Sequence, residues 1–236
     1  MNYTYLDFLA LFGVGGAHPG GLKLTKQLLA EEKVTKQTSL LDVGCGTGQT
    51  SAYIAHHYGC RVHALDCNEI MAEKAQQRFS TLKLPIDVKV GDTESLPFPD
   101  ASFDMILSES VTSFTNIAAT IPEFKRTLRP NGVLLAIETV LEQPISDEEK
   151  HQIMTFYRFP QLFTEAEWHT SFIQAGFKQI EMTTYQPSTD QTDEQHAADF
   201  TLSADIDEEL IDIMEEHEEI TRRYEGKIGY RIFRCS

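Results

Sequence analysis

Short apolar runs alternate with segments of helical periodicity between residues 39 and 140. The apolar runs predict five strands, at 39–43, 61–66, 86–90, 103–107 and 133–140. The segments beside them predict helices, at 22–32, from Gln49 onward, at 69–82 and at 117–128. Strands that alternate with helices form a parallel sheet covered on both faces. In such a sheet, a ligand site is expected at the carboxyl ends of the strands, here between the first and the fourth.

The two ends of the chain follow other patterns. Residues 1 to about 15 predict a short amphipathic helix, and the glycine-rich run 13–21 predicts a loop. After residue 140 the pattern predicts helices at 147–157 and 164–175, and strands at 179–185 and 227–234. Thr164 is the expected N-cap of the second helix, Glu167 completes a capping box and Gly176 ends the helix. We expect a single domain over 1–236, with an N-terminal cap at about 1–21 and a lid at about 141–176.

Composition narrows the class of protein. The 236 residues are 41% hydrophobic, enough to bury one full core. We expect no membrane span, because every long stretch carries charges, and no signal peptide, because the first basic residue is Lys23. The four cysteines, at 45, 60, 67 and 235, lack the spacing of a disulfide framework and are expected to be free thiols. Together these features predict a cytoplasmic protein.

The charge is strongly acidic and concentrated in one segment. Residues 187–225 hold 14 acidic side chains and two arginines, so they supply −12 of the net charge of −16. Apolar residues inside this segment keep helical spacing, which predicts a helix with one buried face and a solvated acidic face: Ile206, Leu210, Ile213, Met214 and Ile220. Such a chain lacks the basic surface that binds phosphates, so we expect no nucleic-acid partner.

The first predicted strand leads into a glycine-rich turn. Gly44, Gly46 and Gly48 are spaced two apart, and the helix that follows begins at Gln49. Glycines let a ligand approach the main chain, and the N-terminus of the helix offers unpaired N–H groups. A dinucleotide fingerprint would place its third glycine where Gln49 stands. Asp42 precedes the first glycine by two positions.

Two further stretches hold candidate ligand contacts. Asp66 ends the second strand, 18 positions after Gly48, where an acidic residue commonly accepts from the hydroxyls of a ribose. The run 91–98, Gly-Asp-Thr-Glu-Ser-Leu-Pro-Phe, follows the third strand and contains Asp92 and Thr93. The run 128–134, Leu-Arg-Pro-Asn-Gly-Val-Leu, is predicted as a turn before the fifth strand.

In this order the four stretches resemble the motifs of the class I S-adenosylmethionine (SAM) dependent methyltransferases. Leu40 to Gly48 is similar to their motif I, and 91–98 and 128–134 resemble the branch that includes quinone-biosynthesis enzymes. The resemblance covers residues 40–134. It implies an α/β fold, a Rossmann-like seven-stranded and mostly parallel sheet with an antiparallel last strand, helices on both faces and a small lid after strand five. It also implies SAM as cofactor and S-adenosylhomocysteine as product.

The resemblance further implies which residues bind the cofactor. Asp66 would hold the ribose, Asp92 would accept from the adenine amino group, and Thr93 would flank the base with its N–H. The loop at 13–21 contains a His-Pro-Gly-Gly segment similar to one that precedes motif I in some methyltransferases, so it either folds over the ligand or is a plain connector. The full candidate set is His18, Asp42, Gly44, Cys45, Gly46, Gly48, Asp66, Cys67, Asp92, Thr93, Ser108 and Glu109.

Methyl transfer is an in-line displacement that needs alignment and exclusion of water more than a covalent catalyst. Glu109, at the end of the fourth strand, is the catalytic candidate. It could hold the SAM ammonium, act as a general base or favour a cationic acceptor; a simple helix N-terminal acid is the alternative. Weaker candidates for the acceptor pocket are Tyr3, Tyr5, Glu138, Tyr157 and Arg158. No pair of histidines has metal-ligand spacing, so we predict no metal.

The expected activity is transfer of a methyl group to a small-molecule acceptor. Two alternatives stay open: a SAM-binding protein that does not transfer methyl groups, and a nicotinamide-dependent oxidoreductase, which Gln49 disfavours. The sequence identifies neither the acceptor nor the methylated atom, and it is compatible with a monomer or a homodimer.

Overall fold

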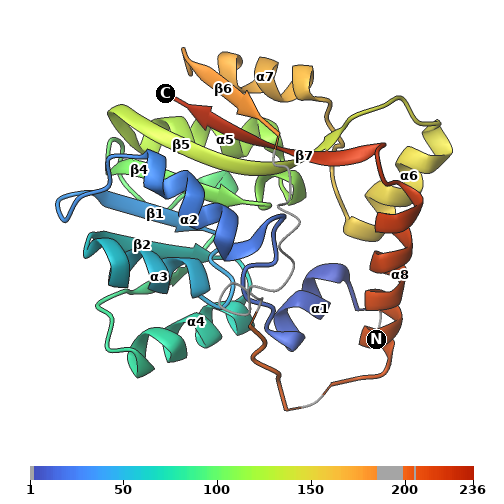
Figure 1. Cartoon of the computed structure of the whole chain (residues 1–236), viewed down its shortest axis with the longest axis horizontal. Helices are drawn as coiled ribbons and strands as arrows, with labels where there is room; N and C mark the ends of the chain where they lie inside the picture. Colours follow the sequence, from blue (N-terminus) through green and yellow to red (C-terminus); the bar gives the residue numbers. More distant parts are fainter. Residues whose placement is uncertain (1–2, 185–198, 205) are drawn as a thin grey trace.

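The computed structural model describes residues 3–184, 199–204 and 206–236. Within them, seven strands form one sheet in the order β3-β2-β1-β4-β5-β7-β6 (Figure 1). β1 pairs in parallel with β2 and β4, whereas β7 is antiparallel to both of its neighbours, β5 and β6. The predicted mostly parallel sheet with an antiparallel last strand is therefore confirmed. The order reverses beside β1, which places a crevice between the carboxyl ends of β1 and β4.

The strands are β1 (Ser39–Val43), β2 (Arg61–Asp66), β3 (Val88–Val90), β4 (Phe103–Glu109), β5 (Leu128–Leu141), β6 (Ile180–Thr183) and β7 (Ile228–Cys235). The α-helices are α1 (Tyr5–Phe12), α2 (Gly21–Glu31), α3 (Gln49–Tyr58), α4 (Glu69–Thr81), α5 (Ile117–Thr127), α6 (Asp147–Tyr157), α7 (Glu165–Gln174) and α8 (Glu209–Arg223). Two short 3₁₀ helices are η1 (Thr93–Ser95) and η2 (Thr112–Phe114).

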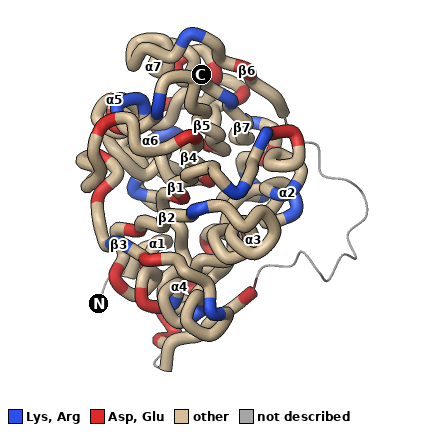
Figure 2. Tube along the Cα trace, turned by 90° about the vertical axis from the view of Figure 1, so that its left-hand side faces the viewer, with Lys and Arg blue, Asp and Glu red and all other residues tan. Residues whose placement is uncertain are grey.

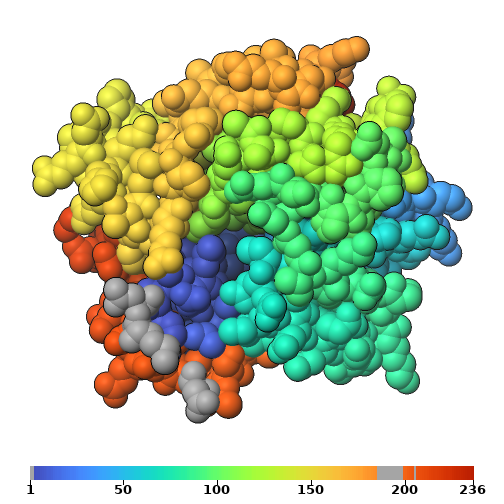
Figure 3. Space-filling model, turned by 180° about the vertical axis from the view of Figure 1, so that it is seen from behind, coloured from blue at the N-terminus to red at the C-terminus, as the bar shows by residue number. Residues whose placement is uncertain are grey.

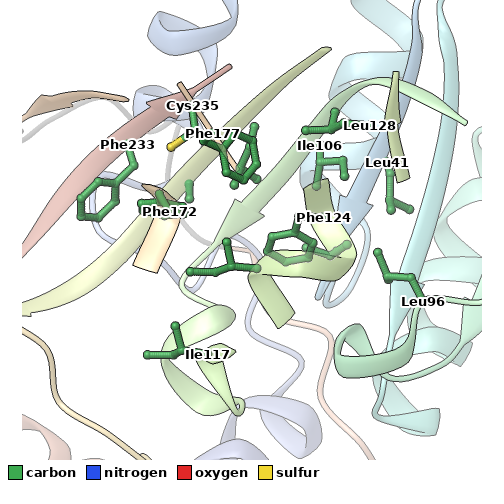
Figure 4. Packing of buried hydrophobic residues seen from close by; sticks show 14 of the residues in the cluster. Leu41, Leu96, Ile106, Ile117, Phe124, Leu128, Phe172, Phe177, Phe233 and Cys235 are labelled. Atoms are coloured by element: carbon green, nitrogen blue, oxygen red, sulfur yellow. The ribbon is translucent and has the colours of Figure 1, made fainter. Parts of the chain in front are cut away.

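Helices cover both faces of the sheet because the central strand is apolar on both sides. All five residues of β1 are buried, and the neighbours Leu40 and Leu41 point into different cores. Leu40 packs with side chains of α2, α3 and α4, including Ile54 and Phe79. Leu41 lies on the other face, where α5 and α7 contribute aromatic side chains such as Phe124 (Figure 4).

A third cluster joins the end of the chain to the region after β5. α8 presents Leu210, Ile213, Met214 and Ile220 inward and acidic residues outward, as their spacing predicted, whereas Ile206 precedes the helix. It packs with α6 around Ile153, while Tyr5 of α1 lies between the two helices. α1, α6 and α8 thus lie together beside the carboxyl ends of the strands (Figure 1). The rest of the acidic segment at 187–198 lies outside the described residues.

Most predicted boundaries hold to within two residues, but the stretch 128–134, predicted as a turn, is different. These residues belong to β5, where Leu128 pairs with Phe103 and Val133 pairs with Met105. The extra residues bulge out of the ladder, and Asn131 takes a left-handed conformation with a φ of 66°. The prediction of a separate turn was wrong because a bulge uses the same Asn-Gly chemistry as a turn.

Helix ends follow the local sequence closely. In α7, Thr164 accepts from the backbone N–H of Glu167, and the Glu167 carboxylate accepts from the backbone N–H of Thr164. The predicted capping box is therefore confirmed. The third strand is shorter than predicted and β4 is longer, reaching Glu109. That extension places Glu109 on the rim of the crevice.

Candidate functional site

The glycine turn, residues 44–48, lies at the carboxyl end of β1 and opens α3. Its three glycines have positive φ angles of 61°, 54° and 77°. A Cβ at Gly44 would overlap Val111, and one at Gly48 would overlap the ring of Phe79. A Cβ at Gly46 would meet nothing within 4 Å. Gly44 and Gly48 are therefore small so that the protein can pack, whereas Gly46 faces open space.

Asp66 ends β2 beside this turn. One carboxylate oxygen accepts from the N–H of Gly46 at 2.8 Å, and the other accepts from the N–H of Asn68 at 2.9 Å. Burial raises the pKa of the Asp66 carboxyl, and these backbone bonds partly offset the rise. The two bonds fix the orientation of the carboxylate and leave part of its acceptor capacity unused.

Asp42 lies beneath the turn and is 2% exposed. Burial raises its pKa to about 8, and the neighbouring carboxylates of Glu109 and Asp66 add to the rise. The hydroxyl of Ser51 donates to Asp42 at 2.5 Å. At neutral pH, Asp42 is thus mainly a neutral acid that ties β1 to α3.

Asp92 and Thr93 lie at the neighbouring strand end. Val90, the last residue of β3, pairs with Asp66, so Asp92 follows it at the same rim. The Asp92 carboxylate accepts from the N–H of Glu94 at 2.8 Å and caps η1, while Thr93 is buried. The side chain of Asp92 remains exposed to solvent.

The two candidate cysteines take different positions. Cys67 directly follows Asp66 and is exposed at the same rim. Cys45 is buried within the turn, and burial raises the pKa of its thiol well above the usual value. A buried neutral thiol is a packing group, so Cys45 contributes its backbone to the turn.

Glu109 meets His18 and two threonines that the sequence did not indicate. Its carboxylate accepts from the hydroxyl of Thr25 at 2.5 Å and from that of Thr50 at 3.1 Å. The Nε2 atom of His18 lies 3.2 Å from the same carboxylate, and the two side chains are 4% and 7% exposed. Ser110, the next residue, has a strained φ of 59°. The rim of β4 thus holds a buried polar cluster, defined by His18, Thr25, Thr50 and Glu109.

Ser108 faces a second polar group, built around Glu138 of β5. Glu138 is fully buried and accepts from the hydroxyl of Ser108 at 3.1 Å and from the N–H groups of Thr112 and Ser113 at 3.0 Å each. Burial raises the pKa of Glu138. Donors from the protein occupy the oxygens of the Glu138 carboxylate. Because two of these donors belong to η2, Glu138 holds η2 against the sheet.

The N-terminal loop, residues 13–20, is held in place from two sides. On one side, the N–H of Gly15 donates to the carbonyl of Asp199, and the N–H of Thr201 donates to the carbonyl of Gly13. On the other, His18 reaches the polar cluster. Arg78 of α4 joins these parts, because it donates to the carbonyl of Thr47 at 2.7 Å and pairs with Asp199 at 2.7 Å. Nothing in the sequence signalled this role for Arg78.

The surface is hollowed where the blue N-terminal residues meet the cyan, green and yellow parts of the chain (Figure 3). Among the described residues, no three His, Cys, Asp or Glu side chains gather as a metal site requires. Within the same residues, no helix combines the length and apolar character needed to cross a bilayer.

Comparisons with known proteins give the family of the chain. A family model described as a methyltransferase domain matches residues 41–136. The uncharacterized methyltransferase YodH of Bacillus subtilis (strain 168) is 38% identical over 229 residues, which cover 97% of each chain.

Solved structures share the fold at low identity. Phosphoethanolamine N-methyltransferase 2 of Haemonchus contortus, in complex with SAM, superposes with a TM-score of 0.79 at 19% identity and covers 99% of this chain, which spans 57% of that enzyme. The [4+2]-cyclase SpnF superposes with a TM-score of 0.67 at 19% identity, covering 95% of this chain and 85% of that one. With the motifs, the sheet order and the relative from Bacillus subtilis taken together, the chain belongs to the class I SAM-dependent methyltransferases.

Proposed function

We propose that this protein transfers a methyl group from SAM to a small-molecule acceptor by in-line displacement. One observation carries the proposal: Gly46 opens onto free space beside the oriented carboxylate of Asp66. A side chain at position 46 would intrude into that space. The position therefore suits a ligand that lies against the main chain, with a sugar at the end of β2.

The residues of the rim fit the parts of SAM. Asp66 has acceptor capacity left for ribose hydroxyls, because an ionised carboxylate has about four lone-pair sites and the backbone N–H groups of Gly46, Asn68 and Cys67 do not fill them all. Asp92 would accept from the adenine amino group, and Thr93 would flank the base. Gly44 and Gly48 shape the turn, and Cys45 and Cys67 line it through their backbone.

Charge favours SAM over a dinucleotide. Asp66, Asp92 and Glu109 place carboxylates around the crevice. SAM carries a sulfonium and an ammonium group, which carboxylates stabilise, whereas the pyrophosphate of a nicotinamide cofactor would be repelled. This argument supports the methyltransferase over the oxidoreductase.

The reactive group is the sulfonium of SAM, which supplies an activated methyl group when bound. The protein would contribute alignment of the acceptor and exclusion of water. His18 and the N-terminal loop lie over the rim, where they would cover a bound cofactor. The hollow beside the N-terminal residues in Figure 3 is where we propose that a small acceptor enters. We further propose one domain, with residues 1–21 as cap and 141–176 as lid.

The surface supports a small acceptor. Lys and Arg residues are scattered among Asp and Glu residues on the face that Figure 2 shows, and the net charge is −16. A nucleic acid would find little to neutralise its phosphates. A protein that binds SAM without transferring its methyl group is the second candidate, because the [4+2]-cyclase SpnF has the same fold.

Replacing Asp66 with Asn tests the cofactor assignment. The variant keeps the size of the side chain but loses its charge and one of its two backbone bonds, so we expect SAM affinity to fall by about 1.5 to 3 kcal/mol, or roughly 10- to 150-fold. Isothermal titration with SAM and with S-adenosylhomocysteine measures it. Asp87→Asn, on the exposed residue just before β3, is the matched control and should bind normally.

Equal affinities of wild type and Asp66→Asn would remove the basis for this site. Formation of S-adenosylhomocysteine in a fractionated metabolite extract then separates the two candidates. Turnover supports the enzyme. Tight SAM binding without turnover in any fraction supports the protein that binds SAM only.

A further inference from the structure

The polar cluster around Glu109 joins four parts of the chain. His18 comes from the N-terminal loop, Thr25 from α2, Thr50 from the first turn of α3 and Glu109 from the end of β4. Thr25 and Thr50 are separated from Glu109 by 84 and 59 positions. The contact of Thr25 therefore exists only when α2 is docked on the rim, and that of His18 only when the loop is docked there.

The donors nearly saturate the Glu109 carboxylate. Oε1 accepts from Thr25, and Oε2 accepts from Thr50 and lies in contact with His18. Two of about four lone-pair sites are thus taken by hydroxyl donors, and the His18 ring covers a third. A general base needs a lone pair directed at the acceptor. Glu109 is poorly arranged for that role.

His18 is oriented by a second contact. Its Nδ1 atom lies 3.2 Å from the carbonyl of Pro19. Nε2 is then the atom that faces Glu109. The ring is fixed between the loop's own backbone and the rim of β4, and the side chain is 4% exposed.

We propose that Glu109 is a positioning residue, and that with His18, Thr25 and Thr50 it clamps the N-terminal loop across the cofactor crevice. This proposal rests on the proposed function, because it assumes that the crevice binds SAM. The clamp orders residues 13–20 before the cofactor binds, so less conformational entropy is lost on binding. Loss of the clamp weakens binding of the cofactor first and turnover only as a consequence.

The test combines hydrogen exchange with cofactor titration on the full chain. Amide exchange at 13–24 is measured without ligand, and S-adenosylhomocysteine affinity by calorimetry, for wild type, His18→Ala, His18→Gln, Glu109→Gln and Thr50→Val. We expect exchange to rise and affinity to fall about tenfold in His18→Ala and Glu109→Gln, because each loses a buried polar contact. His18→Gln keeps a donor and should recover most of the affinity.

The double variant His18→Ala/Glu109→Gln decides whether the residues act together. A clamp predicts a double variant no weaker than Glu109→Gln alone, whereas independent contacts would add. His56→Gln on the exposed side of α3 and Thr81→Val at the exposed end of α4 are matched controls. Thermal unfolding confirms that each variant is folded at the temperature used.

Other outcomes overturn the proposal. Unchanged exchange at 13–24 in both single variants would show that there is no clamp. A fall in kcat for Glu109→Gln at unchanged affinity and exchange would instead make Glu109 the base. If wild type binds no S-adenosylhomocysteine, the proposed function fails, and the exchange of the ligand-free protein still decides whether the clamp exists.

Discussion

Three glycines in one turn are small for different reasons. All have positive φ angles, which only glycine adopts without strain. A Cβ atom at position 48 would lie 2.6 Å from Phe79 and 3.0 Å from Ala75. Helix α3, which begins at the turn, therefore packs tightly on α4. Gly46 has no such neighbour. Packing explains why position 48 holds glycine, and the proposed cofactor site would explain position 46.

Two alanine variants separate these constraints. Gly46→Ala should lower the free energy of unfolding by about 1 to 2 kcal/mol, the cost of a left-handed alanine. Gly48→Ala should lower the free energy of unfolding by about 1 to 3 kcal/mol more than Gly46→Ala does, because its methyl group overlaps Phe79. Urea unfolding measures both. Folded Gly46→Ala should nevertheless bind the cofactor more weakly than wild type. Equal losses of unfolding free energy in the two variants would contradict this explanation.

Helix α4 links parts of the chain that are far apart in sequence. Lys74 donates to the carbonyls of Ala10 and Leu11, which end α1, and to that of Thr201. One turn later, Arg78 reaches the glycine turn and Asp199. These two side chains hold the N-terminal segment and residues 199–203 to the core, and burial lowers the pKa of Lys74.

Arg78→Ala tests this link. It removes the donor to the Thr47 carbonyl and the partner of Asp199, so we expect the free energy of unfolding to fall by about 1 to 3 kcal/mol. Amide exchange at 44–48 should rise with it. Arg222→Ala, at an exposed position near the end of α8, is the control. If the two variants have the same free energy of unfolding and the same amide exchange at 44–48, α4 holds the turn by apolar packing alone.

The complete fold contains several buried acids, and each of them makes the protein less stable as the pH rises. Burial raises the pKa of Asp42, Asp66 and Glu138. The native state therefore binds more protons than the unfolded state above the unfolded pKa values. Stability contributed by these groups is present at low pH and is lost as pH rises through the folded values. The protein tolerates this cost where the acids hold the turn, the rim and η2.

Asp42→Asn isolates one of these contributions. The pKa of Asp42 rises from 3.8 to about 8 on folding, so wild type should lose stability relative to the variant between these two pH values. The difference should reach a few kcal/mol, since each pKa unit corresponds to about 1.4 kcal/mol. Urea unfolding at pH 5 and pH 8 measures it. A difference that does not change with pH would mean that Asp42 is ionised throughout.

Local patterns were sufficient for the elements and for part of the site. The apolar periods, the glycine turn and the capping box of α7 depend on residues within a few positions of one another, so they can be interpreted without a structure. The acid at the end of β2 was predicted in the same way, because the end of a parallel strand faces the ligand edge. The bulge at Asn131 was missed, since a bulge depends on the neighbouring strand.

Long-range contacts needed the folded chain. The sequence marked His18 and Glu109 as separate candidates, yet only the structure joins them and adds Thr25 and Thr50 from two helices. The same holds for Arg78 with Asp199, and for β7, which enters the sheet between β5 and β6. The physical reason is range: backbone conformation depends on near neighbours, whereas a buried hydrogen bond requires a donor and an acceptor that only tertiary packing brings within 3 Å.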